Sequence, residues 1–209
     1  MKSISPEIKC MQLTDPRDYT ESQLKDIAAL IYQTDPYIYP AMFRSQENAE
    51  LLIPELILRG DSMFCAENLF VSMAADTIVG IILWHKGPLD WDPGLLNEIE
   101  CAYGIEQSPY LALAKEKYFC SYNNAPEDRI SIINVCTKSD FRNVGIGSIL
   151  LHSFIEEHRE CRQFELYVLA DNLRAIHLYQ KCGFSAVECL QGFSIDNRDL
   201  PCLRMLKTI

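Results

Sequence analysis

The chain has 209 residues, a formal net charge of −10, and 48% hydrophobic against 23% charged residues. This length suits one globular domain with a full core, so we expect a single domain over residues 1–209. The acidic balance argues against binding to nucleic acid or to an anionic membrane surface. No apolar run approaches the length of a membrane span, and the first residues lack the apolar segment of a signal peptide, so we expect a cytoplasmic protein.

The N-terminal part of the chain predicts a strand, two helices and a β-hairpin. Helices are indicated where apolar residues recur every three or four positions, and strands where short β-rich runs lie between turn residues. Tyr37–Pro40 is predicted as a loop, and Pro54 is expected to kink or split the second helix. The expected elements are a strand at Ile8–Leu13, helices at about Leu24–Tyr32 and Gln46–Leu58, and strands at Leu69–Ala75 and Thr77–His85.

Residues 86–126 form an irregular insertion. Several prolines and glycines break its pattern into short pieces, and only Leu111–Tyr118 is predicted to be helical. A stretch of this length without regular structure is unusual in a compact domain and often carries function. We therefore expect substrate specificity to lie in this insertion.

Strands and helices alternate in the C-terminal part. With the earlier elements, the order becomes β-α-α-β-β, an insertion, and then β-α-β-α-β-β. This order predicts an α/β (α+β) fold, in which helices cover both faces of a mixed sheet. The expected elements are strands at Ile130–Thr137 and Phe164–Val168, helices at Ile149–Arg159 and Asn172–Cys182, and final strands at Phe184–Leu190 and Leu203–Lys207, joined by a polar turn at Ile195–Leu200.

The turn Arg142–Ser148, between a strand and a helix, has the features of an anion site. Gly145 and Gly147 allow unusual backbone dihedral angles and remove the Cβ atoms that would keep a ligand away. The first amides of the helix have no partner inside it, and the helix dipole adds to their attraction for an anion. Glycine turns before helices are common, so this pattern alone is not specific.

A second motif makes the assignment specific. Within Leu166–Phe184 a strand ends, Asn172 caps a helix, Tyr179 lies two turns along it, and Gly183 turns the chain into the next strand. Together with Arg142-x-x-Gly-x-Gly upstream, this segment resembles the GNAT superfamily of acetyl-CoA-dependent N-acetyltransferases. The two motifs cover residues 130–184, the expected acetyl-CoA-binding core, and the order of elements extends the resemblance over most of the chain.

The resemblance implies a largely antiparallel sheet of about seven strands, in which two central strands splay apart as a V that receives acetyl-CoA. The turn amides would bind the pyrophosphate, and the free edge of the strand Ile130–Thr137 would pair with the pantetheine arm. Tyr179 would protonate the leaving thiolate, and such a general acid contributes about 10²–10⁴-fold. The implied cofactor contacts are Val135, Cys136, Thr137, Arg142, Asn143, Val144, Gly145, Ile146, Gly147, Ser148, Asn172, Ala175 and Tyr179.

Several of these residues also have simpler structural roles. Asn172 is a good N-cap whether or not it touches a cofactor. Tyr179 could be a packing aromatic, and Arg142 could contact phosphate through its side chain or only through its amide. Cys136 could be a nucleophile, but no charged neighbour in the sequence would lower its pKa, which favours a buried structural thiol.

The general base is missing from the place where many relatives carry a glutamate, because Ile130–Thr137 contains neither a carboxylate nor a histidine. His85 is a base candidate, since an imidazole can accept a proton near neutral pH. A lone histidine at a strand end is nevertheless more often a surface residue. The alternatives are Glu98 or Glu100 in the insertion, Asp140, and a chain of waters.

Nine cysteines are spread irregularly along the chain, with no C-x-x-C pair and no histidine at metal-ligand spacing. This pattern fits neither a disulfide framework nor a zinc site. We expect reduced thiols that fill small apolar spaces, and no structural metal.

The expected function is transfer of the acetyl group of acetyl-CoA to a primary amine of a small molecule, by direct attack in a ternary complex. The expected partners are acetyl-CoA and this amine, and a homodimer is left open. One alternative is acetylation of a protein N-terminus or lysine. Another is a non-catalytic acyl-CoA-binding module, which the missing strand carboxylate favours and Tyr179 disfavours. A dinucleotide-dependent oxidoreductase is poorly supported, because no acidic residue follows at the ribose position.

Overall fold

The computed structural model describes residues 7–89, 92, 94–106, 124–195 and 198–209. Its helices are α1 (Glu21–Tyr32), α2 (Ile38–Phe43), α3 (Gln46–Arg59), α4 (Gly94–Ala102), α6 (Ile146–Glu157) and α7 (Leu173–Lys181). Its strands are β1 (Ile8–Gln12), β2 (Leu69–Ala74), β3 (Thr77–Lys86), β4 (Arg129–Thr137), β5 (Gln163–Leu169), β6 (Ser185–Ile195) and β7 (Arg198–Thr208).

Seven strands form one sheet in the order β1-β2-β3-β4-β5-β7-β6. Every neighbouring pair is antiparallel except β4 and β5, which run parallel at the centre. The connection between these two strands is α6, as a parallel pair requires a crossover. The predicted mixed, largely antiparallel sheet is therefore confirmed.

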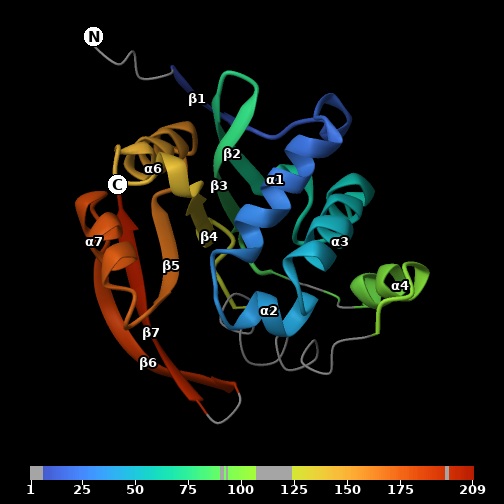
Figure 1. Ribbon diagram of the computed structural model, residues 1–209. Helices are drawn as coiled ribbons and strands as arrows, with labels where there is room; N and C mark the ends of the chain where they lie inside the picture. Colours follow the sequence, from blue (N-terminus) through green and yellow to red (C-terminus); the bar gives the residue numbers. More distant parts are fainter. Residues whose placement is uncertain (1–6, 90–91, 93, 107–123, 196–197) are drawn as a thin grey trace.

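Two apolar cores lie on opposite faces of the sheet, and Figure 1 shows the strands between two groups of helices. The first core gathers the buried sides of α1 to α4, with Ile27 and Leu52 fully enclosed. The second core lies under α6 and α7, around Phe154 and Phe164. Helices thus cover both faces, as expected from the order of elements.

Two helices differ from the sequence-based expectation. Tyr37–Pro40, predicted as a loop, contributes most of its residues to α2. Pro40 is tolerated there because it lies in the first turn, where a backbone amide has no partner within the helix. The second predicted helix runs unbroken as α3 through Pro54 and ends at Gly60, which takes a left-handed φ of 77°.

The insertion and the last hairpin also differ in detail. Residues 94–102 of the insertion form α4, whose Leu96 and Ile99 pack into the first core. The predicted helix at Leu111–Tyr118 lies outside the described residues. The last two strands are longer than predicted, since β6 reaches Ile195 and β7 begins at Arg198.

Candidate functional site

The two central strands separate part of the way along the sheet. β4 and β5 pair at only four positions, from Arg129–Ile132 against Gln163–Leu166. Beyond them β4 continues to pair with β3, and β5 with β7. The edge of β4 from Ile133 to Thr137 therefore has no strand partner on the β5 side, and its backbone groups are available to an extended ligand. This is the V-shaped splay that the sequence led us to expect.

A β-bulge lies where the strands part. Asn134 of β4 pairs with Leu83 of β3, but Ile132 already pairs with Trp84, so that Ile133 is the extra residue. A bulge re-aims the side chains that follow it. Ile133 packs into the core of α1 to α4, and Asn134 also turns to that side, where its Oδ1 accepts a hydrogen bond from Tyr39 of α2 at 2.5 Å.

The turn before α6 presents a row of free amides. Asn143 and Gly145 have positive φ values of 65° and 92°, and α6 begins directly afterwards at Ile146. Within the described residues, the amides of Asn143 to Gly147 donate to no backbone acceptor. A Cβ atom added to Gly145 would meet nothing within 4 Å, so the space in front of the turn is open. These features suit an anion at the positive end of a helix dipole.

Other residues of this turn hold its shape. Arg142 donates from Nε to the carbonyl of Thr137 at 2.9 Å, so its side chain closes the turn onto β4. A Cβ atom on Gly147 would lie 3.2 Å from Leu178, which shows that Gly147 lets α6 approach α7 closely. Val144 is 68% exposed, whereas Ile146 is buried. Ser148 lowers the pKa of the nearby Cys182 thiol, against the larger raising effect of burial.

Tyr179 of α7 faces the splay. Its side chain is 8% exposed, and its ring packs edge-on against Phe184. Burial, and secondly the nearby thiols of Cys136 and Cys182, raise the pKa of Tyr179. Since Cys136 is one of the groups that raise the pKa of Tyr179, the phenol lies near the free part of β4. No described residue forms a hydrogen bond with its hydroxyl group, which is therefore available as a proton donor.

Asn172 and Ala175 mark the start of the same helix. The Oδ1 atom of Asn172 accepts a hydrogen bond from the amide of Ala175 at 3.1 Å, so the predicted cap is formed. Arg174, between them, donates to Asn143 Oδ1 at 3.0 Å and ties the start of α7 to the turn before α6. The two predicted motifs are thus brought together along one side of the splay.

Cys136 has the environment of a structural thiol. Its side chain is 8% exposed and forms no disulfide. Burial raises the pKa of the Cys136 thiol, and the opposing effect of Arg142 is smaller. A thiol with a raised pKa carries little thiolate at neutral pH and is a poor nucleophile.

Of the base candidates named from the sequence, His85 lies apart from Cys136. His85 pairs with Ser131, five residues before Cys136 on β4 or about 16 Å along the strand. Its Nε2 lies 2.7 Å from the carbonyl oxygen of Pro88. Of the other three candidates, Glu98 pairs with Arg59 on the surface, Glu100 is buried on α4, and Asp140 is exposed beyond the end of β4.

A buried polar group that the sequence did not indicate lies at the splay. Asn134 donates from Nδ2 to Thr34 Oγ1 at 2.7 Å, in addition to its bond with Tyr39. Asp35, next to Thr34, is 5% exposed, and its Oδ1 accepts hydrogen bonds from the amides of Tyr37 and Ile38. The only local signal for Asp35 was an Asp-Pro pair after a helix, which is typical of any turn.

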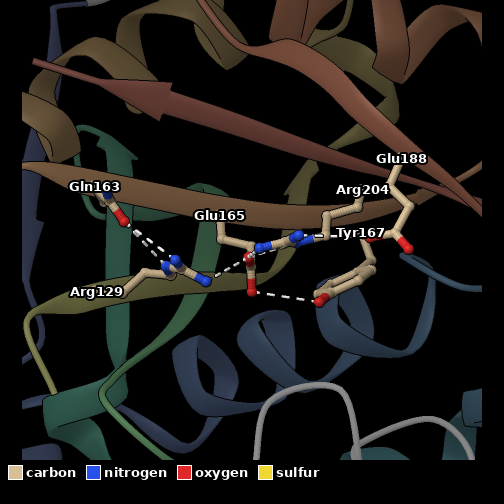
Figure 2. A network of polar contacts seen from close by, with 6 residues as sticks. All are labelled: Arg129, Gln163, Glu165, Tyr167, Glu188 and Arg204. Carbon is tan, nitrogen blue, oxygen red and sulfur yellow. Dashed lines mark hydrogen bonds and ion pairs between the residues drawn. The ribbon is translucent and has the colours of Figure 1, made fainter. Parts of the chain in front are cut away.

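A second polar network lies on the same face of the sheet, where β4 and β5 are still paired. Glu165 is 1% exposed, and its Oε2 accepts from Arg129 at 2.9 Å and from Arg204 at 2.8 Å. Figure 2 shows the carboxylate between the two guanidinium groups, with Tyr167 on its other oxygen. Burial, and then Glu165, raise the pKa of Tyr167 to about 12. The network ties β4, β5 and β7 together next to the point where the splay begins.

The described ranges show neither a metal-binding cluster nor a membrane-spanning helix. These ranges contain no group of three or more His, Cys, Asp and Glu side chains that could hold a metal ion. Every helix in them is too short or too polar to cross a bilayer.

Comparison with known proteins gives one consistent family. A family model described as the acetyltransferase (GNAT) family matches residues 38–184. No curated protein sequence matches the chain significantly.

Solved structures share the fold at low sequence identity. An N-acetyltransferase from Staphylococcus aureus Mu50 superposes with a TM-score of 0.63 at 16% identity, covering 95% of this chain and 100% of that one. The ribosomal-protein-S18-alanine N-acetyltransferase from Escherichia coli gives 0.56 at 13% identity, covering 97% and 94%. The NatC complex bound to Gag peptide and CoA gives 0.55 at 15% identity, covering 97% and 99%. At these identities the likeness establishes the fold alone.

Proposed function

The chain belongs to the acetyltransferase (GNAT) family, and from this membership we propose that it moves the acetyl group of acetyl-CoA to a primary amine of a small molecule. The observation that carries the proposal is the row of free amides from Asn143 to Gly147, which opens onto the unpaired edge of β4. Attack takes place directly in a ternary complex of enzyme, acetyl-CoA and amine. The environment of Cys136 supports this route, because its thiol is poorly suited to a covalent relay.

The residues of the splay fit acetyl-CoA. The turn amides and the α6 dipole would hold the pyrophosphate, and Gly145 leaves open space in front of them. Val135, Cys136 and Thr137 lie on the free edge of β4 and would pair with the amide groups of the pantetheine arm. Arg142 supports this site by closing the turn, and because its amide donates to the carbonyl of Ser139 at 3.1 Å, its contribution comes through turn geometry.

The chemistry needs a proton donor on the leaving-group side. Acetyl-CoA supplies an acetyl group activated as a thioester, whose departing sulfur requires a proton. Tyr179 faces β4 and remains protonated at neutral pH, because burial raises the pKa of its phenol. A positioned general acid contributes about 10²–10⁴-fold.

We assign the whole chain, residues 1–209, to one acetyltransferase domain, since all seven strands belong to one sheet. The first part of the 86–126 insertion packs as α4 against the core of α1 to α4, which supports a covered pocket for a small acceptor. A cytoplasmic location stays a prediction for imaging of the tagged protein. Homodimer formation stays a prediction that the mass in solution tests.

Incubation with acetyl-CoA and a mixed panel of primary alkylamines, polyamines and short peptides tests the proposal. Free CoA and acetylated product are both quantified by mass spectrometry. We expect equal amounts of CoA and of one acetylated small amine. Product confined to peptides would indicate protein acetylation instead, and tight CoA binding without any product would indicate a binding module.

A further inference from the structure

Asp35 is a buried carboxylate whose two oxygens have different environments. Oδ1 accepts hydrogen bonds from the amides of Tyr37 and Ile38 at 2.7 and 2.8 Å, and so caps the start of α2. Oδ2 has no hydrogen-bond partner among the described residues. Oδ2 is not among the fully buried side-chain atoms that lack a partner, so it retains some access from outside the core. The capping role therefore explains the position of Asp35 but leaves half of its hydrogen-bonding capacity unused.

Asp35 lies at the β4 arm of the splay, because Thr34, the residue before it, accepts a hydrogen bond from Asn134 of β4 at 2.7 Å. Burial, and then Asp35, raise the pKa of Tyr39, which is bonded to Asn134 on the β4 arm. Burial, and then Asp35, also raise the pKa of the Cys202 thiol, which lies on the other arm. Cys202 pairs with Leu169, three positions beyond the last residue of β5 that pairs with β4. The carboxylate of Asp35 thus affects titratable groups at both separated strands, on the face of the sheet opposite α6 and α7.

Among the described residues, no cation balances the charge of Asp35. Burial raises the pKa of Asp35, opposed only by its two backbone hydrogen bonds, and no arginine or lysine of the described residues contributes. The titratable groups that face it are Tyr39 from α2 and Cys202 from β7, and both are neutral at pH 7. A buried carboxylate without a cation is stabilised by a cationic ligand.

We propose that Oδ2 of Asp35 binds the ammonium group of the acceptor and takes its proton as the general base of the reaction. This inference rests on the proposed acetyl transfer. One proton passes from the ammonium nitrogen to Asp35 and later to solvent. The neutral nitrogen then forms a C–N bond with the acetyl carbon as the C–S bond breaks. Tyr179 gives its proton to the departing thiolate, and the second proton that the nitrogen loses on becoming an amide returns by way of solvent to the Tyr179 phenolate. Tyr179 and Asp35 thus act from opposite faces of the same gap.

Asp35→Asn is the first test, because an asparagine Oδ1 can still cap α2 while its amide cannot accept the proton. On an amine that the wild type acetylates, we expect kcat to fall about 10²–10⁴-fold. The Kd for acetyl-CoA should be unchanged. The melting temperature at pH 7 should be equal or higher, since a carboxyl with a raised folded-state pKa weakens folding when it is ionised. Asp15→Asn is the matched control, because Asp15 also caps a helical turn but is exposed and distant.

A second readout does not depend on turnover. The carboxyl carbon of Asp35 is followed by NMR in the CoA-saturated protein while n-butylammonium chloride is added. We expect its resonance to move and its pKa to fall, because a bound cation favours the carboxylate, and we expect Asp15 not to respond. Wild-type kcat in Asp35→Asn, or an Asp35 signal that ignores the ammonium, would overturn the assignment. If neither protein acetylates any amine, the proposed function fails, and the NMR experiment still decides whether Asp35 binds ammonium.

Discussion

Gly145 occupies a backbone conformation that other residues rarely adopt, with φ at 92°, in front of the amides proposed to hold a pyrophosphate. The space where a side chain would begin is empty. Glycine is therefore required for the direction of the chain, and any side chain would extend into the region proposed for the ligand.

Gly145→Ala separates these two effects when it is compared with Gly60→Ala. Gly60 has a similar φ of 77° and similar free space, but it ends α3. Both changes should lower the free energy of unfolding by about 1–2 kcal/mol, the cost of a left-handed residue with a Cβ. Only Gly145→Ala should weaken acetyl-CoA binding, by about tenfold or 1.4 kcal/mol in calorimetry. Equal acetyl-CoA affinity in the two variants would contradict the assignment of the turn.

Tyr179→Phe should keep the ring packing against Phe184 and remove the proton donor. We expect kcat to fall about 10²-fold, with little change in the KM for acetyl-CoA. Tyr103→Phe is the control, because Tyr103 is exposed and bonds to Glu55. Steady-state kinetics with an acetylated amine measures both. Undiminished kcat in Tyr179→Phe would leave Tyr179 with a packing role only.

The same tyrosine predicts a feature of the pH profile. The donor is the neutral phenol, which is populated below its pKa, and burial raises the pKa of Tyr179. Deprotonation of Tyr179 should therefore cause no loss of kcat as pH rises from 7 to about 10, the ordinary pKa of tyrosine. A fall of kcat in that range that disappears in Tyr179→Phe would show that the phenol ionises in the ordinary range.

At the scale of elements, the splay depends on how firmly β4 and β5 are held where they do pair. Glu165 lies between Arg129 and Arg204 and connects β4, β5 and β7 next to that point. Removal of a buried charge from such a network leaves its partners uncompensated. The network therefore fixes the place where the two strands separate.

Glu165→Ala should lower the free energy of unfolding by about 3 kcal/mol, at the lower end for a broken buried pair because Arg204 is partly exposed. Glu188→Ala provides the comparison, since Glu188 is half exposed and 3.5 Å from the same arginine. Glu188→Ala should lower the free energy of unfolding by less than about 1 kcal/mol. Urea unfolding followed by circular dichroism measures both variants, and equal effects would show that Glu165 carries no special role.

Local patterns in the sequence predicted most elements but misplaced some boundaries. The central strand was predicted at Ile130–Thr137 and forms at Arg129–Thr137, because its β-branched run is buried on both faces. Pro40 suggested a loop, although a proline in a first turn is compatible with a helix. The start of α6 was predicted three residues late, since Gly145 directly precedes its first residue, Ile146.

The candidate site was predictable only where its residues are close in the sequence. The motifs around Gly145 and Tyr179 carry their own local signals. The contacts of Asn134 join residues 95 and 100 positions apart, and no local pattern records such a pairing. For the same reason Asp35 looked like an ordinary turn residue before the fold placed it at the β4 arm of the splay.

For the molecule as a whole, the state of the cysteines decides whether the protein must be kept under reducing conditions. The cysteines in the described part of the chain form no disulfide with one another, and most of them are buried. Burial raises the pKa of thiols such as Cys65 and Cys202 to about 11, which slows their oxidation.

Addition of a thiol reductant should leave the melting temperature unchanged, because the described cysteines form no disulfide with one another. Reduction of a native disulfide would instead lower the free energy of unfolding by about 2–5 kcal/mol. Thiol titration of the denatured protein should find all nine cysteines. In the native protein the exposed Cys189 should react first. A lower melting temperature in reductant, or fewer than nine thiols, would reveal a disulfide.

The central claim is that the turn before α6 holds the pyrophosphate of acetyl-CoA. Amide hydrogen exchange at Asn143 to Gly147 tests it most directly, because these amides have no backbone partner in the described residues. They should exchange fast in the free protein and become protected when acetyl-CoA is added, while the amides of α3, in the core on the opposite face of the sheet from α6, stay unchanged. Acetyl-CoA that binds and protects other amides but leaves these five exchanging freely would contradict the account.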